Sequence, residues 1–299
     1  MPVEIRQRIE ERASEIPFAE LKRAAAAMSD AYREGRPFAV SPAAYLVTRM
    51  PATYAATYSA LRELPEGLPP IETVLDIGAG TGAASLAARA VFPQAKIEMV
   101  ERDAALAKEA RGLLPGADII AADAARMERF PERDLVIAAY SLGEIGAGAA
   151  IRLWQAARVA LVIIEPGTPK GFALIRAIRD ELIAAGAHIA APCPGAMACP
   201  MVDPDWCHFA ARVERSSLHR RLKGGELGYE DEKYSYVAFT REPLPLPPAR
   251  IVRRPQHHPG WIEIRTCTEN GLDTQRVTKR ERELFRAARR AAWGDAFGN

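Results

Sequence analysis

The stretch from Val74 to Gly82, VLDIGAGTG, constrains the fold of this chain more than any other. Its apolar, β-branched start predicts a buried strand, and the alanine-rich run at 83–90 predicts a helix directly after it. Glycines at alternate positions between a strand and a helix let a ligand approach the backbone N–H groups at the helix start. The sequence therefore predicts a strand–turn–helix unit that binds a ligand.

Two classes of ligand use such a turn. The dinucleotide fingerprint G-x-G-x-x-G/A fits Gly78, Gly80 and Ala83, which would indicate NAD. Asp76 favours S-adenosylmethionine, because a carboxylate two residues before the first glycine suits an amino group rather than a pyrophosphate. Gly78, Gly80 and Gly82 are then the glycines expected to contact it. A tight turn that binds nothing stays open as a third interpretation, since a glycine motif alone is a weak signal.

From residue 71 onward, apolar strand candidates alternate with stretches long enough to be helices. Nearly continuous apolar strands joined by helical crossovers predict a parallel sheet that is covered on both faces. The expected fold class is α/β with a Rossmann-like core, in which ligands bind beyond the carboxyl ends of the strands. The expected strands are 72–77, 96–101, 117–121, 134–140 and 160–165.

Acidic residues stand at the ends of the next two strands. Glu101 ends the second strand, one predicted helix further along the chain than Gly82, where a carboxylate can accept both ribose hydroxyls. Asp123 follows the third strand, within reach of an adenine amino group. Each acid alone is a common surface residue, but with Asp76 and the glycines they favour S-adenosylmethionine over NAD.

The segments before and after this core differ in character. Residues 3–34 and 41–64 predict helices, with a break at the Gly-Arg-Pro sequence 35–37. Beyond residue 234, short strands are expected at 234–240, 250–254, 260–267 and 275–279, and a closing helix at 284–293. Five basic residues of this last part are candidates for phosphate contacts: Arg253, Arg254, Lys279, Arg280 and Arg282.

Composition restricts the compartment. No run approaches the ~18 apolar residues of a membrane span, and the charged N-terminus is unlike a signal peptide. A cytoplasmic protein with reduced cysteines is therefore expected. Residues 201–299 carry 18 basic and 14 acidic side chains, which favours an anionic partner for this part. The sequence does not determine the oligomeric state; a monomer is the working expectation.

All four cysteines lie after the predicted parallel sheet, at Cys193, Cys199, Cys207 and Cys267. Four thiolates suit zinc or an iron–sulfur cluster. The intervals between them are all longer than the C-x2–4-C spacing of zinc sites, and two cysteines precede proline, as one does in bacterial ferredoxins. His208, His257 and His258 could replace a thiolate, which keeps zinc open. Buried cysteines without a ligand stay open as well.

Several motifs together resemble the methyltransferase-like proteins of the small ribosomal subunit, bacterial relatives of a mitochondrial ribosome assembly factor. The similarity covers about residues 37–280. Besides the glycine turn, it rests on Arg49-x-Pro51-Ala52-Thr53-Tyr54, Glu165-Pro166-Gly167-Thr168-Pro169-x-Gly171-Phe172, Ala191-Pro192-Cys193-Pro194, Asp205-Trp206-Cys207-His208-Phe209 and Tyr229-Glu230-Asp231-Glu232-Lys233-x-Ser235-Tyr236.

The resemblance implies a class I S-adenosylmethionine-dependent methyltransferase core, association with small-subunit ribosomal RNA, and a cysteine-bound iron–sulfur cluster. We therefore expect a [4Fe–4S] cluster on the four cysteines, with zinc as the alternative. The expected organisation is an N-terminal helical region (1–70), a methyltransferase-like core (71–192), a cysteine-rich metal-binding segment (193–233) and a basic β-subdomain with a terminal helix (234–299).

The sequence leaves open whether the chain is an enzyme. The predicted fourth strand ends in Tyr140-Ser141-Leu142-Gly143-Glu144, unlike the N-P-P-Y loop used on exocyclic amines, and no cysteine stands where a cytosine-C5 enzyme would need one. No catalytic residue can be assigned. A methyltransferase acting on ribosomal RNA and an inactive RNA-binding assembly factor that keeps its cofactor site both fit. An NAD-dependent reductase would lack a candidate proton donor.

Overall fold

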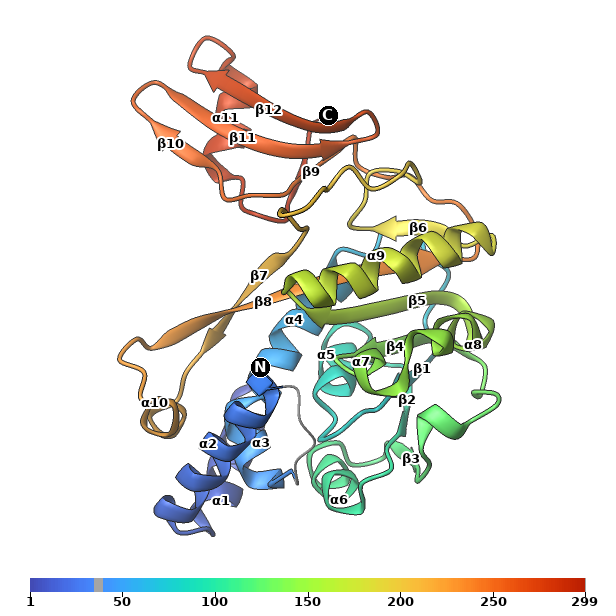
Figure 1. Cartoon of the computed structure of the whole chain (residues 1–299), viewed down its shortest axis with the longest axis vertical. Coiled ribbons are helices and arrows are strands. Elements are labelled where there is room, and N and C mark those ends of the chain that lie inside the picture. Colours follow the sequence, from blue (N-terminus) through green and yellow to red (C-terminus); the bar gives the residue numbers. More distant parts are fainter. Residues whose placement is uncertain (35–39, 299) are drawn as a thin grey trace.

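The computed structural model describes residues 1–34 and 40–298, so the predicted break at 35–37 lies outside the described residues. The N-terminal part is helical, as predicted. Its helices are α1 (Val3–Ser14), α2 (Phe18–Glu34), α3 (Pro42–Thr48) and α4 (Met50–Arg62). Figure 1 shows them in blue beside the sheet that follows.

The predicted parallel sheet is confirmed. Its first strands are β1 (Thr73–Ile77), β2 (Lys96–Val100), β3 (Asp118–Ile120), β4 (Arg133–Ala139) and β5 (Ala157–Pro166). These pair in parallel in the order β3-β2-β1-β4-β5. The chain reverses direction across the sheet between β1 and β4, which is the switch point of a doubly wound, Rossmann-like fold.

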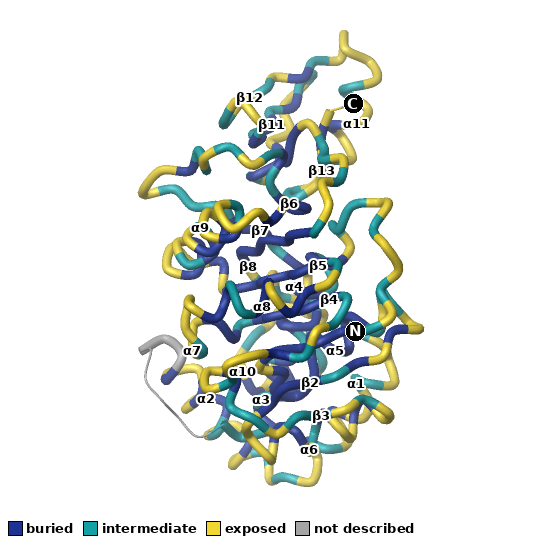
Figure 2. The backbone as a smooth tube through the Cα atoms, turned by 90° about the vertical axis from the view of Figure 1, so that its right-hand side faces the viewer, coloured by how far each residue is buried: buried dark blue, intermediate teal, exposed yellow. Residues whose placement is uncertain are grey.

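Helices cover both faces of this sheet, because successive side chains along each strand are buried on opposite sides. Val74, Leu135 and Ile137 belong to one core, with α4, α5 (Ala83–Val91) and α6 (Ala104–Leu113). Leu75 and Val136 belong to the other, with α8 (Ala150–Ala156) and α9 (Pro169–Ala184). Strands β4 and β5 are accordingly dark along most of their length in Figure 2.

A correction concerns the strand expected at 234–240 in the C-terminal β-subdomain. The strand exists as part of β8 (Tyr229–Thr240), but it lies in the large sheet, antiparallel between β5 and β6 (His188–Ala191). Its inner half is apolar and buried, and burial between two strands stabilises it more than a place in a small exposed sheet would.

The outer half of β8 leaves the large sheet as an arm. It pairs with β7 (Phe209–Glu214), and α10 (Ser217–Lys223) joins the two strands. Helix α4 packs against β7, while α10 contacts α2 and α3. The arm therefore ties the N-terminal helices to the sheet (Figure 1).

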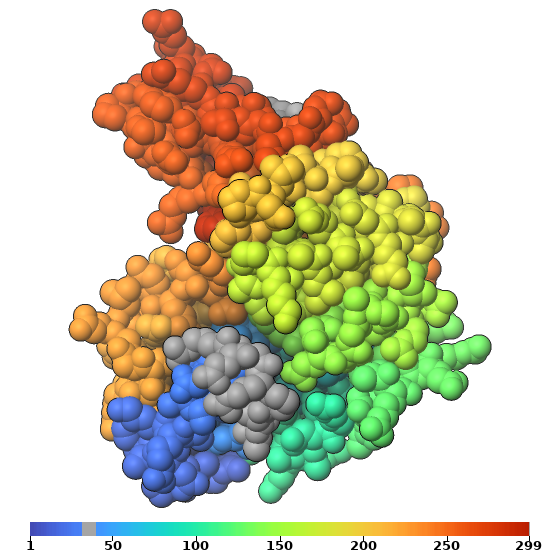
Figure 3. All heavy atoms as spheres, viewed as in Figure 1, coloured from blue at the N-terminus to red at the C-terminus, as the bar shows by residue number. Residues whose placement is uncertain are grey.

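The small C-terminal sheet begins at β9 (Ala249–Ile251) and contains β10 (Gln256–His258), β11 (Trp261–Thr268), β12 (Gly271–Thr278) and β13 (Ala296–Phe297). The predicted closing helix is α11 (Arg282–Arg290), and its apolar side covers one face of this sheet. In Figure 3 residues beyond about 250 form a lobe that projects from the larger body. Within the described ranges, every helix is too short or too polar to cross a membrane.

Candidate functional site: a glycine turn and a cysteine cavity

The glycine turn lies at the carboxyl end of β1, at the switch point of the sheet. Gly78, Gly80 and Gly82 have positive φ angles of 68°, 57° and 82°, which glycine adopts without the strain that a side chain would add. The N–H groups of Gly78 and Ala79 donate to the Val100 carbonyl at 2.9 and 3.0 Å, so the turn is fastened to β2. A Cβ on Gly78 would lie 2.8 Å from the Ser141 Cβ, closer than atoms pack.

Asp76 is buried beneath this turn, with 1% of its surface exposed. One carboxylate oxygen accepts from the Ser85 N–H at 2.9 Å and from the Ser85 hydroxyl at 2.7 Å. Burial raises the pKa of Asp76 to about 6, although the bonds from Ser85 act in the opposite direction. Asp76 thus links the end of β1 to the first turn of α5.

Glu101 follows β2 and lies directly beside the turn. One of its carboxylate oxygens accepts from the Gly80 N–H at 2.7 Å, and the other from the Asp103 N–H at 2.7 Å. Asp103 in turn caps α6 by accepting from the N–H groups of Ala105 and Leu106. The predicted ribose-binding carboxylate is therefore held next to the central glycine.

Asp123 follows β3 and is more exposed than the other two acids. One oxygen accepts from the Ala125 N–H at 3.1 Å, and the other lies 3.6 Å from the guanidinium groups of Arg102 and Arg126. The structure brings Asp76, Glu101 and Asp123 to the same edge of the sheet, at the ends of neighbouring strands β1, β2 and β3.

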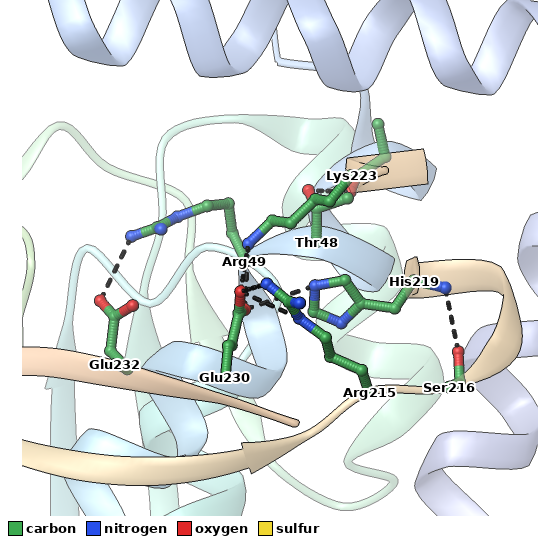
Figure 4. A network of polar contacts seen from close by, with 9 residues as sticks. Thr48, Arg49, Arg215, Ser216, His219, Lys223, Glu230 and Glu232 are labelled. Carbon is green, nitrogen blue, oxygen red and sulfur yellow. Dashed lines mark hydrogen bonds and ion pairs between the residues drawn. The ribbon is translucent and has the colours of Figure 1, made fainter. Parts of the chain in front are cut away.

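Helix α3 and the arm cover part of this edge. The Tyr45 hydroxyl lies 3.8 Å from the place of a Cβ on Gly80. Arg49 follows α3 and lies 3.7 Å from Glu232 of β8 (Figure 4). The hydroxyl of Tyr140, the residue after β4, donates to Glu232 at 3.1 Å. Two motifs far apart in the sequence, around Arg49 and Glu232, thus meet at the carboxyl ends of the strands.

A second group of charges holds the arm itself. Glu230 of β8 lies against Arg215, His219 and Lys223 (Figure 4). Burial alone would raise the pKa of Glu230, but these neighbours hold it well below its usual range. This network fixes α10 on the arm and lies outside the glycine turn.

The residues after β4 and β5 lie at the same edge of the sheet as the glycine turn. Tyr140 is the described non-glycine residue with a positive φ, at 58°, a strained conformation. Glu165 at the end of β5 accepts from the N–H groups of Leu142 at 3.0 Å and Gly143 at 3.4 Å. Burial raises the pKa of Glu165 to about 7. Sequence reasoning gave Glu165 no role, because a strand-end acid in a glycine- and proline-rich motif has many possible uses.

All four cysteines line a second site, a cavity between α9, β8 and the small sheet. The other walls of the cavity are mainly apolar and include Phe172, Ile175 and Val252. Burial raises the pKa values of Cys193 and Cys207, and that of Cys267 to about 12. Among the residues that the structure describes, no three His, Cys, Asp or Glu side chains are arranged to hold a metal ion.

Two arginines, each 3% exposed, flank this cavity. Arg179 of α9 donates to the carbonyls of Gly195 at 3.2 Å and Met197 at 2.6 Å, between the first two cysteines. Its Nε is buried without a hydrogen-bond partner. The burial of Arg179 could have been predicted from the sequence, because this residue falls on the apolar stripe of Ile175, Ile178 and Leu182.

Arg250 joins the parts of the chain that meet here. It donates to the carbonyls of Pro192 at 3.0 Å and Gly294 at 2.8 Å and pairs with Glu63 after α4. On β9 it lies opposite Cys267 of β11. No pattern in the sequence identifies this role, because the partners come from segments spread over most of the chain.

The motif around Gly167 explains how the cavity joins the large sheet. A Cβ on Gly167 would lie 2.6 Å from the backbone of Lys233, and one on Gly171 would lie 2.1 Å from the Pro166 carbonyl oxygen. The Trp206 indole N–H donates to the Gly167 carbonyl at 3.0 Å. These glycines permit close backbone packing beside the cysteine segment.

The five candidate phosphate contacts have different surroundings. Arg253 pairs with Asp205 and donates to the Trp206 carbonyl, so it holds the cysteine segment. Arg254, Lys279, Arg280 and Arg282 are exposed. The outer side of α11 adds a basic surface that sequence reasoning did not single out, formed by Arg286, Arg289 and Arg290, which make no ion pair within the described part of the chain.

Comparison with known proteins identifies the family to which this chain is similar. A family model described as "Mitochondrial small ribosomal subunit Rsm22" matches residues 39–298. Comparison with curated proteins gives no match.

Solved structures similar to this chain include three methyltransferases. The precorrin-6y C5,15-methyltransferase from Geobacter metallireducens is 15% identical, with a TM-score of 0.41, over 62% of this chain and 86% of its own. Magnesium protoporphyrin IX methyltransferase from Synechocystis, solved with bound SAH, is 16% identical, with a TM-score of 0.40, over 64% and 83%. A TehB-like SAM-dependent methyltransferase from Corynebacterium glutamicum is 14% identical, with a TM-score of 0.40, over 76% and 100%.

Proposed function

This chain belongs to the Rsm22 family of the mitochondrial small ribosomal subunit, and from that premise we propose that it binds S-adenosylmethionine at the glycine turn and RNA of the small ribosomal subunit through its C-terminal part. The family match supports the ribosomal partner. The cofactor assignment rests on the observation that three strand-end acids lie at the same edge of the sheet as the glycine turn.

Two of the acids suit parts of S-adenosylmethionine, and the third holds the turn that would receive it. Glu101 would accept the ribose hydroxyls in place of its bond from the Gly80 N–H, and Asp123 would accept from the adenine amino group. Asp76 would hold the turn that receives the methionine end, since its bonds to Ser85 fix β1 to α5. The residues present therefore fit the cofactor.

Bound S-adenosylmethionine supplies an electrophilic methyl group, so the protein's share of the reaction is to position an acceptor and to exclude water. Tyr140 and Glu232 hold the arm against the end of β4. Glu165 holds the segment 142–143 beside the glycine turn. In this proposal Tyr140 and Glu165 act as positioning residues rather than proton donors.

A specific observation favours the second candidate, an inactive RNA-binding factor that keeps the cofactor site. Two polar side chains at the ends of β4 and β5 are engaged with the protein itself, Tyr140 with Glu232 and Glu165 with backbone N–H groups. Profiles of modified nucleotides in small-subunit RNA from cells with and without this protein decide between the two. Loss of one methylated nucleotide supports the enzyme, and an unchanged profile supports the binding factor.

We further propose that the cysteine cavity holds a [4Fe–4S] cluster, with zinc as the alternative. The support is that Cys193, Cys199, Cys207 and Cys267 line one largely apolar cavity, and that Arg179 Nε lies there without a partner. A buried cation and a free donor suit thiolates and sulfides, whose hydrogen bonds and charge stabilise such clusters. Anaerobically purified protein should contain iron and acid-labile sulfide. Colourless protein that contains one zinc ion per chain would show that the cavity holds zinc instead of an iron–sulfur cluster.

The proposed division of the chain follows from these roles. Residues 1–70 cover the core, 71–192 with β8 form it, the cysteine segment joins it to the small sheet, and the small sheet binds RNA.

Phosphate contacts release counterions, so RNA affinity should fall steeply with salt. Replacing Arg286, Arg289 and Arg290 by Glu should weaken RNA binding and make the RNA affinity less dependent on salt concentration. A variant with unchanged RNA affinity would exclude α11 as the contact.

A further inference from the structure

The small sheet has one face covered by α11 and one face that is partly exposed. Ile262, Ile264 and Val277 pack with α11. Because side chains alternate along a strand, their neighbours on β11 and β12 point the other way. This second face carries Trp261, Glu263, Arg265, Thr274, Arg276 and Thr278, and it ends at Cys267 in the cysteine cavity.

Three side chains from three neighbouring strands form a column on this face. The rings of His258 on β10 and Trp261 on β11 are stacked, with centroids 3.9 Å apart and an interplanar angle of 11°. The guanidinium carbon of Arg276 on β12 lies 4.2 Å from the Trp261 ring centroid. His258 and Arg276 are exposed, and β10 is an edge strand of the sheet. The column is therefore open at both ends.

Cross-strand packing alone accounts for part of this arrangement, since such pairs contribute roughly 0.2–1 kcal/mol. It does not explain why the largest aromatic ring of the sheet stands on the partly exposed face between a guanidinium group and an imidazole ring. The surroundings are polar and basic. Residues 250–299 carry 11 basic and six acidic side chains, and Lys279 and Arg280 follow β12 directly beyond Trp261. This chemistry suits an anionic ligand with flat rings.

We propose that this face binds unpaired RNA bases, which stack on the column formed by His258, Trp261 and Arg276 while Lys279 and Arg280 hold the adjoining phosphates. The inference rests on the proposed RNA binding and deepens it by naming single-stranded RNA as the form that this face selects. Stacking on aromatic side chains requires bases with a free face, which a continuous duplex does not offer. The exposed Arg276 side chain gives way to a base or stays as its second stacking partner.

The test measures the affinity of the full-length protein for a single-stranded RNA oligonucleotide and for a fully paired duplex of the same sequence. Trp261→Ala should weaken single-strand binding about tenfold, in line with the contribution of a stacked base, and leave duplex binding almost unchanged. The slope of affinity against salt should stay the same, because Trp261 contacts no phosphate. Trp261→Phe should restore most of the affinity.

Tyr229→Ala is the matched control. Tyr229 is also an exposed aromatic ring under a guanidinium group, that of Arg212 at 4.0 Å, but it lies on the β7–β8 arm. The variant should bind single-stranded RNA as the unchanged protein does. If Trp261→Ala fails to fold, His258→Ala and Arg276→Ala, both at exposed positions, carry the test with expected losses of about threefold each.

The outcomes separate this inference from the proposed function. Unchanged single-strand affinity in the folded Trp261→Ala protein, or an equal loss for duplex RNA, overturns the stacking column and leaves RNA binding intact. A protein without substitutions that binds neither RNA overturns the proposed function itself.

Discussion

The glycine turn draws its geometry from one sheet, whereas the cysteine cavity draws its geometry from segments far apart in the sequence. In the turn, Asp76 and Glu101 are hydrogen-bonded to backbone N–H groups of neighbouring segments in the β1–β2 region. Around the cavity, Arg250 connects the ends of α4 and β6 with residues near the C-terminus. The first site is complete in the folded sheet, and the second depends on long-range contacts and on the group it is proposed to hold.

This difference predicts that each site can be removed without the other. A metal group bound by cysteines contributes to folding, because the unfolded chain has no preformed site. Losing it should loosen the small sheet, which carries Cys267, and spare the glycine turn, which follows β1 of the large sheet.

The largest effect is expected from Gly78→Ala. The positive φ and the 2.8 Å approach to the Ser141 Cβ leave no place for a methyl group, so the turn must shift. S-adenosylmethionine affinity measured by calorimetry should fall at least about 100-fold. Iron content and RNA affinity should not change.

Gly112→Ala in α6 is the matched control, since a Cβ there meets no atom within 4 Å and its φ is ordinary. It should bind the cofactor normally and gain a little stability. Retained cofactor affinity in Gly78→Ala would show that the ligand does not depend on this turn.

Cys267→Ser tests the cysteine cavity. It should lower bound iron and weaken RNA binding about tenfold, because the small sheet loses its link to the cavity. Cofactor affinity should stay within about twofold of that of the unchanged protein. Met197→Leu, a volume-conserving change in the same cavity wall, should leave all three measurements unaltered. Full RNA binding in an iron-free Cys267→Ser protein would contradict the link.

A smaller effect concerns the pH dependence of stability at the glycine-turn edge. The folded protein holds the pKa of Glu165 at about 7, above the value of 4.5 expected for an unfolded chain. Between these values the folded state binds more protons, so the stabilisation is present below about pH 4.5 and is lost as the pH rises through about 7.

Glu165→Gln keeps an oxygen that accepts from Leu142 and Gly143 but cannot ionise. Urea unfolding at pH 6 and pH 7.5 should show a fall in unfolding free energy that is about 1 kcal/mol smaller in the variant. An equal fall in both proteins would mean that Glu165 titrates normally.

The smallest effect is expected at Arg179. Arg179→Gln removes the buried charge and the Nε donor beside Cys193, whereas Arg179→Lys keeps the charge alone. The cluster in Arg179→Gln should be lost to a chelator about threefold faster and have a lower reduction potential. The rate of cluster loss and the reduction potential of Arg179→Lys should lie between those of Arg179→Gln and the unchanged protein. Identical potentials in all three proteins would limit Arg179 to holding the segment 195–197.

The sequence predicted the parts of the fold that repeat a local pattern. The parallel strands and the strand-end positions of Asp76, Glu101 and Asp123 follow from apolar runs and helical crossovers, and the structure has them close to the expected places. The position of β8 in the large sheet did not follow, because an antiparallel strand added from a distant segment has no local signature. Its far end, which meets Arg49, was unforeseeable for the same reason.

The cavity could be predicted only in part. Cysteine spacing gave the four candidates but could not show that they line one space, since Cys267 comes from another sheet. Arg250 was beyond sequence reasoning, as its partners lie in widely separated parts of the chain. The column of His258, Trp261 and Arg276 depends on the register of three strands, and a shift of one residue would place Trp261 under α11.

The independence of the two sites is tested most directly on a single preparation. Anaerobically purified protein is divided, one half is treated with an iron chelator, and the affinities of both halves for S-adenosylmethionine and single-stranded RNA are measured by calorimetry. The account predicts that chelation leaves cofactor affinity within about twofold and weakens RNA binding about tenfold. A parallel loss of both affinities, or RNA binding that survives complete removal of iron, would contradict it.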